Sequence, residues 1–191
     1  MSFLSKEQIE SMGFKSVGEN VLLSDKASYY NCKNISIGNN VRIDDFAVLS
    51  AGVDGIEIGN YIHIAVFSSL IGSGKIILKD FCNISSKVAI YSSNDDYSGE
   101  YMTNPMVPIQ FTNVNHAPVT IGRHVIVGSG SVILPNVTLE DGVAIGALSL
   151  VTKNCEEFGI YMGTPAKKIK ERKRDLLELE NKLNKVQAFV S

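Results

Sequence analysis

The chain has 191 residues, enough for one domain with a sizeable hydrophobic core but short for two full domains. Apolar residues make up 45% and charged residues 20%, a balance typical of a folded soluble protein and too apolar for a disordered one. The formal net charge of −2 provides no global positive field to hold a nucleic-acid backbone or an anionic membrane. We therefore expect neither nucleic acid nor a membrane as a partner.

The N-terminal segment carries neither a basic leader nor an unbroken apolar core, and no stretch approaches the roughly 20 apolar residues that span a bilayer. The cysteines Cys32, Cys82 and Cys155 are odd in number, far apart and without CxxC spacing. This pattern argues against a disulfide framework or a zinc site. We expect a cytoplasmic protein with buried, reduced thiols and no metal.

Residues 5 to 12 are predicted to form a short helix. Ser5 and Gln8 have the spacing of a capping box, and Gly13 can end the helix. An uncovered end of a stack of strands would invite association with other chains. We therefore expect residues 1–16 to cap the start of the strand repeat that follows.

From residue 17 to residue 151, apolar residues return at every sixth position in sets of three, and extra residues enter only between sets. The eighteen positions are Val17, Leu23, Tyr29, Ile37, Ile43, Leu49, Ile58, Ile64, Leu70, Leu78, Ile84, Ile90, Ile121, Val127, Ile133, Leu139, Ile145 and Val151. Neither the helical period of 3.6 nor the strand period of 2 keeps side chains in one direction under this spacing. The pattern predicts an all-β solenoid over residues 17–156, in which each hexad is a short strand plus a corner and three hexads close one of about six three-sided coils.

Residues 92–118 interrupt this repeat with Pro, Asn, Gly, Tyr and Ser, and have no repeat of their own. A long loop inserted in a compact repeat is usually functional or disordered, and we interpret this one as functional.

The remaining segment, residues 157–191, is expected to end in an amphipathic helix. Apolar residues recur there with spacings of three and four among Lys and Glu, at Leu176, Leu179, Leu183, Val186 and Val190. This stripe can pack on the chain's own coils or on a neighbouring subunit. Two heptads are short for a coiled coil, which favours the chain's own coils.

Two motifs resemble one enzyme family. The hexads follow [Ile/Leu/Val]-Gly-x-x-[Val/Ser]-x in places, and GTPAKKIK at residues 163–170 is similar to the G-x-P-A-[KR]-x-[IL]-[KR] ending of hexapeptide-repeat acyltransferases, in the sugar O- and N-acetyltransferase branch. The resemblance implies a left-handed parallel β-helix, acetyl-CoA or another acyl-CoA as co-substrate, and a homotrimer with active sites between subunits. In this family the loop of one subunit helps to build the site at its neighbour.

Some carbonic anhydrases share this fold and bind zinc through three histidines. Here His63, His116 and His124 stand in contexts that do not match that triad. We therefore expect no metal.

The residue at or beside position 95 of the loop indicates whether the acyl group is transferred to a hydroxyl or to an amine. Sugar hydroxyls are too weakly acidic to lose their proton unaided, so hydroxyl-acylating relatives carry a His base, and the matching position here falls at or beside Asp95. An amine, with a reference pKa of about 8, is already nucleophilic in its neutral form and needs little more than positioning and a carboxylate. The replacement of His by Asp favours an amino acceptor.

We expect Asp95, with Asp96 or Ser85, to receive the substrate amine, and His116 is the alternative base. Other substrate contacts are predicted at Asn94, Asp96, Tyr91 and Asn83. On the donor side, the resemblance implies that pantetheine lies along small residues in a groove between two subunits. The matching positions are Ser129, Ala147, Thr152 and Lys153, with Lys167 and Lys170 near the CoA phosphates.

The sequence thus predicts an acyl-CoA-dependent N-acyltransferase. Its acceptor is the amine of a nucleotide-linked amino-deoxy hexose, a small-molecule substrate used in surface polysaccharide synthesis. One alternative is an O-acetyltransferase of a galactoside or related sugar that uses a His base. The other is a trimeric scaffold without catalysis.

Overall fold

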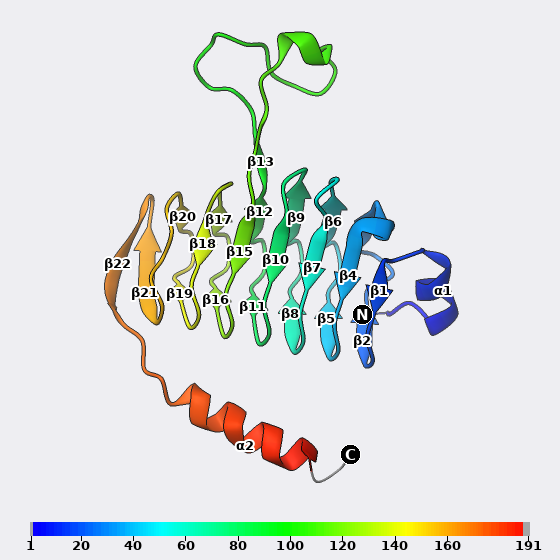
Figure 1. The fold of residues 1–191 in the computed structure, drawn as a ribbon, viewed down its shortest axis with the longest axis vertical. Coiled ribbons are helices and arrows are strands. Elements are labelled where there is room, and N and C mark those ends of the chain that lie inside the picture. The colour runs from blue at the N-terminus through cyan, green and yellow to red at the C-terminus, as the bar shows by residue number, and fades with distance from the viewer. Residues whose placement is uncertain (1, 189–191) are drawn as a thin grey trace.

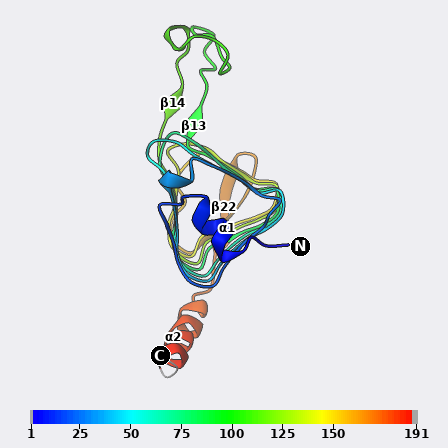
Figure 2. The ribbon, with the colours of Figure 1, turned by 90° about the vertical axis from the view of Figure 1, so that its right-hand side faces the viewer.

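The computed structural model describes residues 2–188, which form a parallel β-solenoid of about seven turns with a helix near each end, consistent with a left-handed β-helix (Figure 1). Figure 2 looks along the solenoid and shows its three-sided cross-section. None of the helices within residues 2–188 has the length and apolar character needed to cross a membrane.

Three sheets form the sides. The first contains β1 (Ser16–Val17), β4 (Ile35–Ile37), β7 (Ile56–Ile58), β10 (Ile76–Leu78), β15 (Val119–Ile121) and β18 (Thr138–Leu139). The second contains β2 (Val21–Leu23), β5 (Val41–Ile43), β8 (Ile62–Ile64), β11 (Asn83–Ile84), β16 (Ile126–Val127), β19 (Ala144–Ile145), β21 (Gly159–Gly163) and β22 (Ala166–Glu171). The third contains β3 (Ser28–Tyr30), β6 (Val48–Ala51), β9 (Ser69–Gly72), β12 (Ala89–Tyr91), β17 (Val132–Ile133) and β20 (Leu150–Val151).

We name the bends by the sheets that they join. The first corner joins the first sheet to the second, as residues 18–20 do in the first coil. The second corner joins the second sheet to the third, as residues 24–27 do, and the third corner joins the third sheet back to the first, as residues 31–34 do. The last of these includes the short 3₁₀ helix η1 (Cys32–Asn34).

The eighteen apolar positions of the six-residue repeat, called the sixfold positions below, stack on one another as expected. In the second sheet, for example, Ile64 pairs with Ile84, which pairs with Val127. All eighteen positions are in matching register from coil to coil. All are buried except Val17 and Tyr29 of the first coil, which are half-buried. The hexad prediction is confirmed, and the inward side chains form one continuous apolar core.

The glycines that follow sixfold positions allow the coils to approach closely. A Cβ on Gly128 would lie 2.5 Å from the backbone nitrogen of Ala147 in the next coil. A side chain at this position would therefore force neighbouring backbones apart.

The corners turn through residues with positive φ. At the first corner these include Tyr61, Phe81 and His124, with φ of 56°, 63° and 57°. Bulky residues rarely adopt this conformation. Their rings stack in parallel with centroids 4.9 Å and 4.7 Å apart, which helps to offset the backbone cost.

The solenoid has a partial seventh turn beyond the six predicted coils. Cys155 forms a bridge with Leu139, and Tyr161 pairs with Ile145. The interval from Val151 to Cys155 is four residues rather than six or more, so counting hexads missed this turn. β22 then folds back antiparallel on β21.

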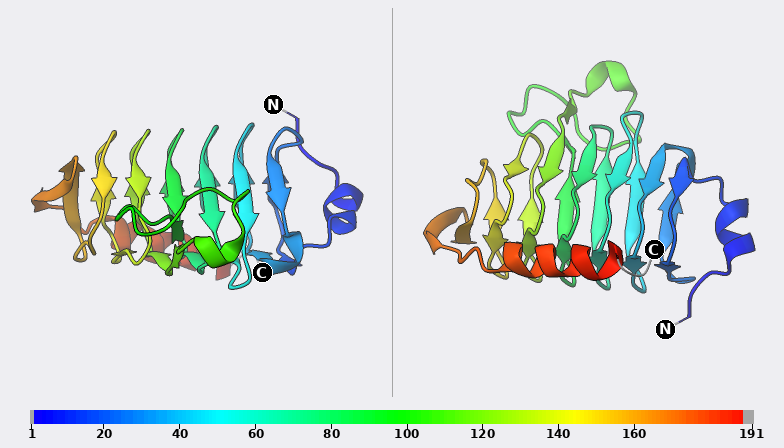
Figure 3. Two further views of the ribbon diagram at one scale, coloured as in Figure 1. Left: turned by 90° about the horizontal axis from the view of Figure 1, so that it is seen from above. Right: turned by 60° about the horizontal axis from the view of Figure 1, so that its bottom comes forward.

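The short N-terminal helix is confirmed as α1 (Lys6–Ser11). Ser5 and Gln8 make both bonds of the capping box, and Gly13 has a positive φ of 69°. Ile9 and Phe14 pack against the core, and α1 covers the first coil (Figures 2 and 3). The helix closes the open end of the core.

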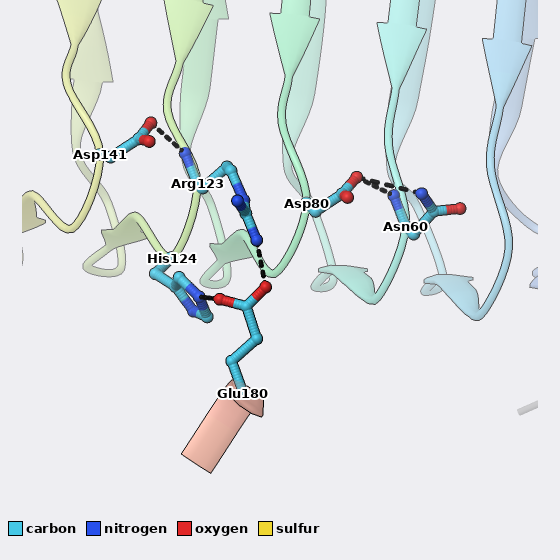
Figure 4. A network of polar contacts seen from close by, with 6 residues as sticks. All are labelled: Asn60, Asp80, Arg123, His124, Asp141 and Glu180. Atoms are coloured by element: carbon cyan, nitrogen blue, oxygen red, sulfur yellow. Dashed lines mark hydrogen bonds and ion pairs between the residues drawn. The ribbon is translucent and has the colours of Figure 1, made fainter. Parts of the chain in front are cut away.

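The C-terminal helix α2 (Leu176–Ala188) runs back along the solenoid (Figure 3). Arg172 donates hydrogen bonds to the carbonyls of His124, at 2.8 Å, and Gly142, at 3.0 Å. One turn into the helix, the Glu180 carboxylate contacts the Arg123 guanidinium and accepts a hydrogen bond of 2.7 Å from His124 Nε2 (Figure 4).

The same corner carries a ladder of polar contacts between coils. Asp141 accepts the Arg123 backbone N–H at 2.8 Å, and Asp80 accepts the backbone N–H of Asn60 at 2.8 Å (Figure 4). These contacts fix adjacent coils to one another at the first corner, which Glu180 contacts.

Most of the apolar stripe of α2 does not pack on the chain's own coils, contrary to the expectation that favoured such packing, and only Leu176 among its described residues is half-buried. Leu179, Leu183 and Val186 are 62%, 37% and 61% exposed. The helix contacts the first corner through Glu180, one turn after Leu176 on the same side of the helix. Val190 of the predicted stripe lies outside the described residues.

We expect the contact of Glu180 to hold α2 in place. The hydrogen bond from His124 and the charge of Arg123 lower the pKa of Glu180 below its ordinary 4.5, against the opposing effect of burial. A lowered pKa stabilises the docked helix fully above pH about 4.5, and this contribution is lost as the pH falls through the lower folded-state value.

Glu180→Gln should therefore speed amide hydrogen exchange in residues 176–186 about tenfold at pH 7. The exposed Glu178→Gln is the matched control on the same helix. Equal exchange in the two variants would show that the carboxylate does not anchor α2.

Candidate active site

The loop leaves the solenoid at the third corner, after β12, and returns before β15, projecting well beyond the coils (Figures 1 and 2). Its neck is a two-stranded antiparallel ribbon of β13 (Ser93–Asn94) and β14 (Asn115–His116), in which Ser93 pairs with His116. The 3₁₀ helix η2 (Ile109–Phe111) lies in the outer part of the loop. The neck fixes both ends of the loop against the corner.

A cavity of about 640 Å³ lies between the base of the loop and the coils that precede it. The coils contribute Asn31, residues 50–52 and residues 71–73, and the loop contributes residues 93–95, Asn104, Pro105, Val107, Ile109, Thr112, Val114 and His116. Asp95 is the one Asp or Glu in this lining, and no Lys or Arg belongs to it. The cavity combines a single carboxylate with amide, hydroxyl and aliphatic groups.

The structure brings three predicted residues together, because Asn94, Asp95 and His116 all line the cavity. Asp96 does not line it. Its carboxylate accepts hydrogen bonds from the Ser98 hydroxyl at 2.6 Å and the Ser98 backbone N–H at 2.9 Å, which lower the pKa of Asp96. Asp96 thus stabilises a turn of the loop.

None of Tyr91, Ser85 and Asn83 lines the cavity. Tyr91 ends β12 and pairs with Ile71, and its side chain is half-buried. Ser85 occupies the second corner, where its carbonyl accepts the Ser68 hydroxyl at 2.9 Å, and Asn83 precedes it on the outer side of the second sheet. The width of the third sheet separates Ser85 from Asp95 within one chain.

The predicted cofactor residues lie at two corners and on β22. Ser129 and Ala147 are exposed on adjacent coils at the second corner, where Leu148 N–H donates to the Ser129 carbonyl at 2.9 Å. Thr152 and Lys153 are exposed at the third corner, and Lys167 and Lys170 are exposed on β22. One chain alone does not bring the two sets together.

The histidines outside the loop are both engaged with carboxylates. His63 Nε2 contacts Asp44 at 2.8 Å, and Arg42 Nε donates to the other oxygen of Asp44 at 2.7 Å. Burial opposes ionisation of Asp44, but these hydrogen bonds outweigh it and lower the pKa of Asp44. His124 is held by Glu180 as described above. His116 is the histidine available to the cavity.

The thiols are poorly suited to nucleophilic catalysis. Burial raises the pKa of Cys82 to about 12 and that of Cys155 to about 11, so the reactive thiolate is disfavoured. All three cysteines are free. Among residues 2–188, no three His, Cys, Asp or Glu side chains are grouped so that they could hold a metal ion.

Sequence reasoning missed the coil residues that line the cavity, among them Asn31 and Ser73, and it missed Ser93 at the neck. The length of one coil, about 20 residues, could have identified these coil residues from the sequence. Ser73 stands 20 positions before Ser93, one coil back, and the backbone N–H of Ser73 donates to the Ser93 hydroxyl at 2.7 Å. Counting back by one coil from the start of the loop would have found the wall opposite Asp95.

Comparison with known proteins agrees with the fold and identifies the family. Residues 118–153 match the family model described as bacterial transferase hexapeptide (six repeats). The chain is 61% identical over 181 residues to dTDP-4-amino-4,6-dideoxy-D-glucose acyltransferase of Escherichia coli, an alignment that covers 95% of this chain and 94% of that protein. A chloramphenicol acetyltransferase of Agrobacterium fabrum is 34% identical over 113 residues, covering 53% of this chain and 54% of that enzyme.

Among solved structures, the chain resembles AntD, an N-acyltransferase from Bacillus cereus, in its complex with dTDP and 3-hydroxybutyryl-CoA. The TM-score is 0.94 and the identity 47%, with 98% of each chain covered. Another AntD structure, of a variant with one serine replaced, contains dTDP-4-amino-4,6-dideoxyglucose and coenzyme A, with a TM-score of 0.93 over 97% of this chain and 98% of that one. With its stacked hexads, its loop and this near full-length similarity, the chain belongs to the hexapeptide-repeat acyltransferases, in the group of N-acyltransferases of nucleotide-linked amino sugars.

Proposed function

We propose that this acyltransferase transfers an acyl group from acyl-CoA to the 4-amino group of dTDP-4-amino-4,6-dideoxyglucose. The observation that carries the proposal is Asp95 in the loop cavity. The family resemblance matches this position to the His base of hydroxyl-acylating relatives. The near full-length similarity to an E. coli acyltransferase named for this sugar nucleotide supports the choice of acceptor.

In the proposed reaction, the neutral amine of the sugar attacks the thioester carbonyl. The new C–N bond forms as Asp95 orients the amine and takes the proton that it loses. The tetrahedral intermediate then collapses, the C–S bond breaks, and the CoA thiolate leaves and is protonated. Holding the amine against the thioester supplies much of the rate enhancement.

Ser85 is proposed to donate its hydroxyl to the thioester group during this step. AntD has been solved with one aspartate replaced and with one serine replaced, and that serine lies ten residues before the aspartate. Ser85 and Asp95 have the same separation here. The shared spacing supports a joint role for the two side chains.

We propose a homotrimer, which the positions of these residues support. Ser85, Ser129 and Ala147 occupy the second corner, whereas Asp95 and Thr152 lie at the third corner or on the loop that leaves it. A site that uses both sets forms where the second corner of one copy meets the third corner of another, and closed threefold symmetry repeats this contact without open ends. Acyl-CoA would then lie along the small residues of this seam, with Lys153, Lys167 and Lys170 near its phosphates.

A mixing experiment tests the shared site. Ser85→Ala and Asp95→Ala should each be nearly inactive alone, whereas co-expression should restore activity to about a quarter of the sites, because a random mixture pairs an intact Ser85 with a neighbouring intact Asp95 at that frequency. Separately purified variants mixed without subunit exchange are the control. Activity that stays at the level of the single variants would place both side chains in the same subunit's site.

The substrate is tested by thiol release from acetyl-CoA and 3-hydroxybutyryl-CoA with a panel of acceptors. We expect turnover with dTDP-4-amino-4,6-dideoxyglucose and none with the matching 4-hydroxy sugar nucleotide or with simple galactosides. Turnover confined to galactosides would replace the proposal with O-acetylation. No turnover and no protection against thermal unfolding by CoA would favour the non-catalytic scaffold.

A cytoplasmic location is part of the proposal and is supported by the three free cysteines. The expected role in surface polysaccharide synthesis stays a prediction.

A further inference from the structure

A chain of hydrogen bonds at the loop neck joins Ser73, Ser93 and His116, and the proposed reaction uses none of these three residues. The Ser73 backbone N–H donates to Ser93 Oγ at 2.7 Å, and Ser93 Oγ lies 2.7 Å from His116 Nδ1. Ser73 follows β9, while Ser93 and His116 face each other across the neck. The chain therefore links the wall of the cavity to the imidazole ring.

The hydrogen bonds along this chain favour one form of the His116 ring. A serine hydroxyl has one proton to donate, and Ser93 Oγ already accepts the proton of Ser73 N–H. If Ser93 donates to Nδ1, every group in the chain has a partner. If Nδ1 donates to Ser93 instead, the hydroxyl proton is left to solvent, because no second acceptor for it lies within residues 2–188. The arrangement therefore favours a neutral imidazole with its proton on Nε2.

The second nitrogen of this ring is the one available to a ligand. Nε2 has no hydrogen-bond partner among residues 2–188, and His116 lines the same cavity as Asp95. The cavity lining contains no Lys or Arg, and Ile71, Val107, Ile109 and Val114 make part of it aliphatic. A neutral N–H donor in such surroundings suits an uncharged oxygen, a hydroxyl or a carbonyl, better than a phosphate.

We propose that His116 binds the acceptor substrate as a neutral hydrogen-bond donor through Nε2, and that Ser93 is the positioning residue that fixes its tautomer. The inference rests on the proposed function, because it assigns His116 to binding and leaves the proton of the amine to Asp95. It decides between the two bases that the sequence left open.

The tautomer can be measured without reference to activity. Nitrogen–proton correlation spectra of the protein labelled with ¹⁵N-histidine, with His116→Gln to assign the ring, should show neutral His116 with the proton on Nε2 at pH 7.5. Ser93→Ala should abolish this preference, and Ser93→Thr, which keeps the hydroxyl, should retain it. A neutral ring with its proton on Nδ1, or a charged ring at this pH, would overturn the proposal.

Steady-state kinetics test the binding role. His116→Ala should raise KM for the amino sugar nucleotide about five- to tenfold and leave kcat close to the wild-type value. His116→Gln, whose amide can donate from a similar position, should recover most of that loss. If His116 is the base instead, both variants lose about 10²- to 10⁴-fold in kcat.

The positioning role of Ser93 is tested separately by the kinetics of Ser93 variants. Ser93→Ala should raise KM and not kcat, and Ser93→Thr should behave as wild type. A change in thermal stability without a change in KM would reduce Ser93 to a structural residue and contradict the proposal. Comparing the dissociation constants of the wild type and His116→Ala for dTDP alone shows which part of the substrate His116 contacts: a contact to the dTDP part weakens dTDP binding, and a contact to the amino sugar leaves it unchanged.

Failure of the proposed function is distinguishable from failure of this inference. If no amino sugar nucleotide is acylated by the wild-type protein, the proposed function is wrong, whereas the spectra still report the tautomer of His116. If acylation proceeds and the two His116 variants lose kcat together, the proposed function stands and the role given to His116 is wrong.

Discussion

Replacing Asp95 with alanine or asparagine is expected to lower kcat about 10²- to 10⁴-fold, with a small change in KM for acyl-CoA. Asp95 is the one Asp or Glu of the loop cavity, and no Lys or Arg lines it. Asparagine keeps the size and the hydrogen-bonding oxygen of the side chain and removes its capacity to take a proton. Thiol release at saturating substrates measures the loss.

Asp96→Asn is the matched control. It makes the same chemical change one residue along the loop, where the carboxylate holds a turn through Ser98 rather than lining the cavity. We expect activity close to wild type. If Asp96→Asn is the more damaging change, or if Asp95→Asn retains full kcat, the proton of the amine goes elsewhere.

Val127→Asp should destabilise the fold by about 4–5 kcal/mol, a large part of the stability of a typical domain. Val127 is 0% exposed and stacks between Ile84 and Ile145 at the axis of the solenoid. A carboxylate there has no water and no cation to stabilise it. Urea unfolding followed by circular dichroism measures the effect, with Asn136→Asp, at an exposed position in the third corner of the same coil, as the control.

An unfolding midpoint for Val127→Asp close to that of the wild type would contradict the description of the core. It would mean that this sixfold position tolerates water, which a dry axis does not.

The repeat could be read from the sequence because its cause is local and recurrent. Each sixfold side chain, such as Ile64, contacts its equivalents in the coils above and below, so every coil repeats the same requirement for an apolar residue. The corners impose no such requirement. At the second corner, positive φ is adopted by apolar Phe67 and Leu148, by charged Lys87 and by Gly130, so no single residue type marks the position.

Other features depend on contacts that no local pattern encodes. The stripe on α2 predicted a helix correctly, but the face that meets the solenoid is set by Glu180 and its partners Arg123 and His124, more than 50 residues earlier. In the same way, Asp95 was found by matching a position in the family, whereas Asn31 joins it in the cavity because three coils stack at one corner.

The narrow neck of the loop allows the loop to change without disturbing the stacked coils. Because β13 and β14 pair with each other and the Ala117 N–H donates to the Ser92 carbonyl at 3.0 Å, the chain leaves and re-enters the solenoid at neighbouring points. The intervening residues can change in length and composition while β12 and β15 keep their places in the stack. Acceptor preference can therefore diversify, in nature or in the laboratory, by transplanting one surface segment onto an unaltered scaffold.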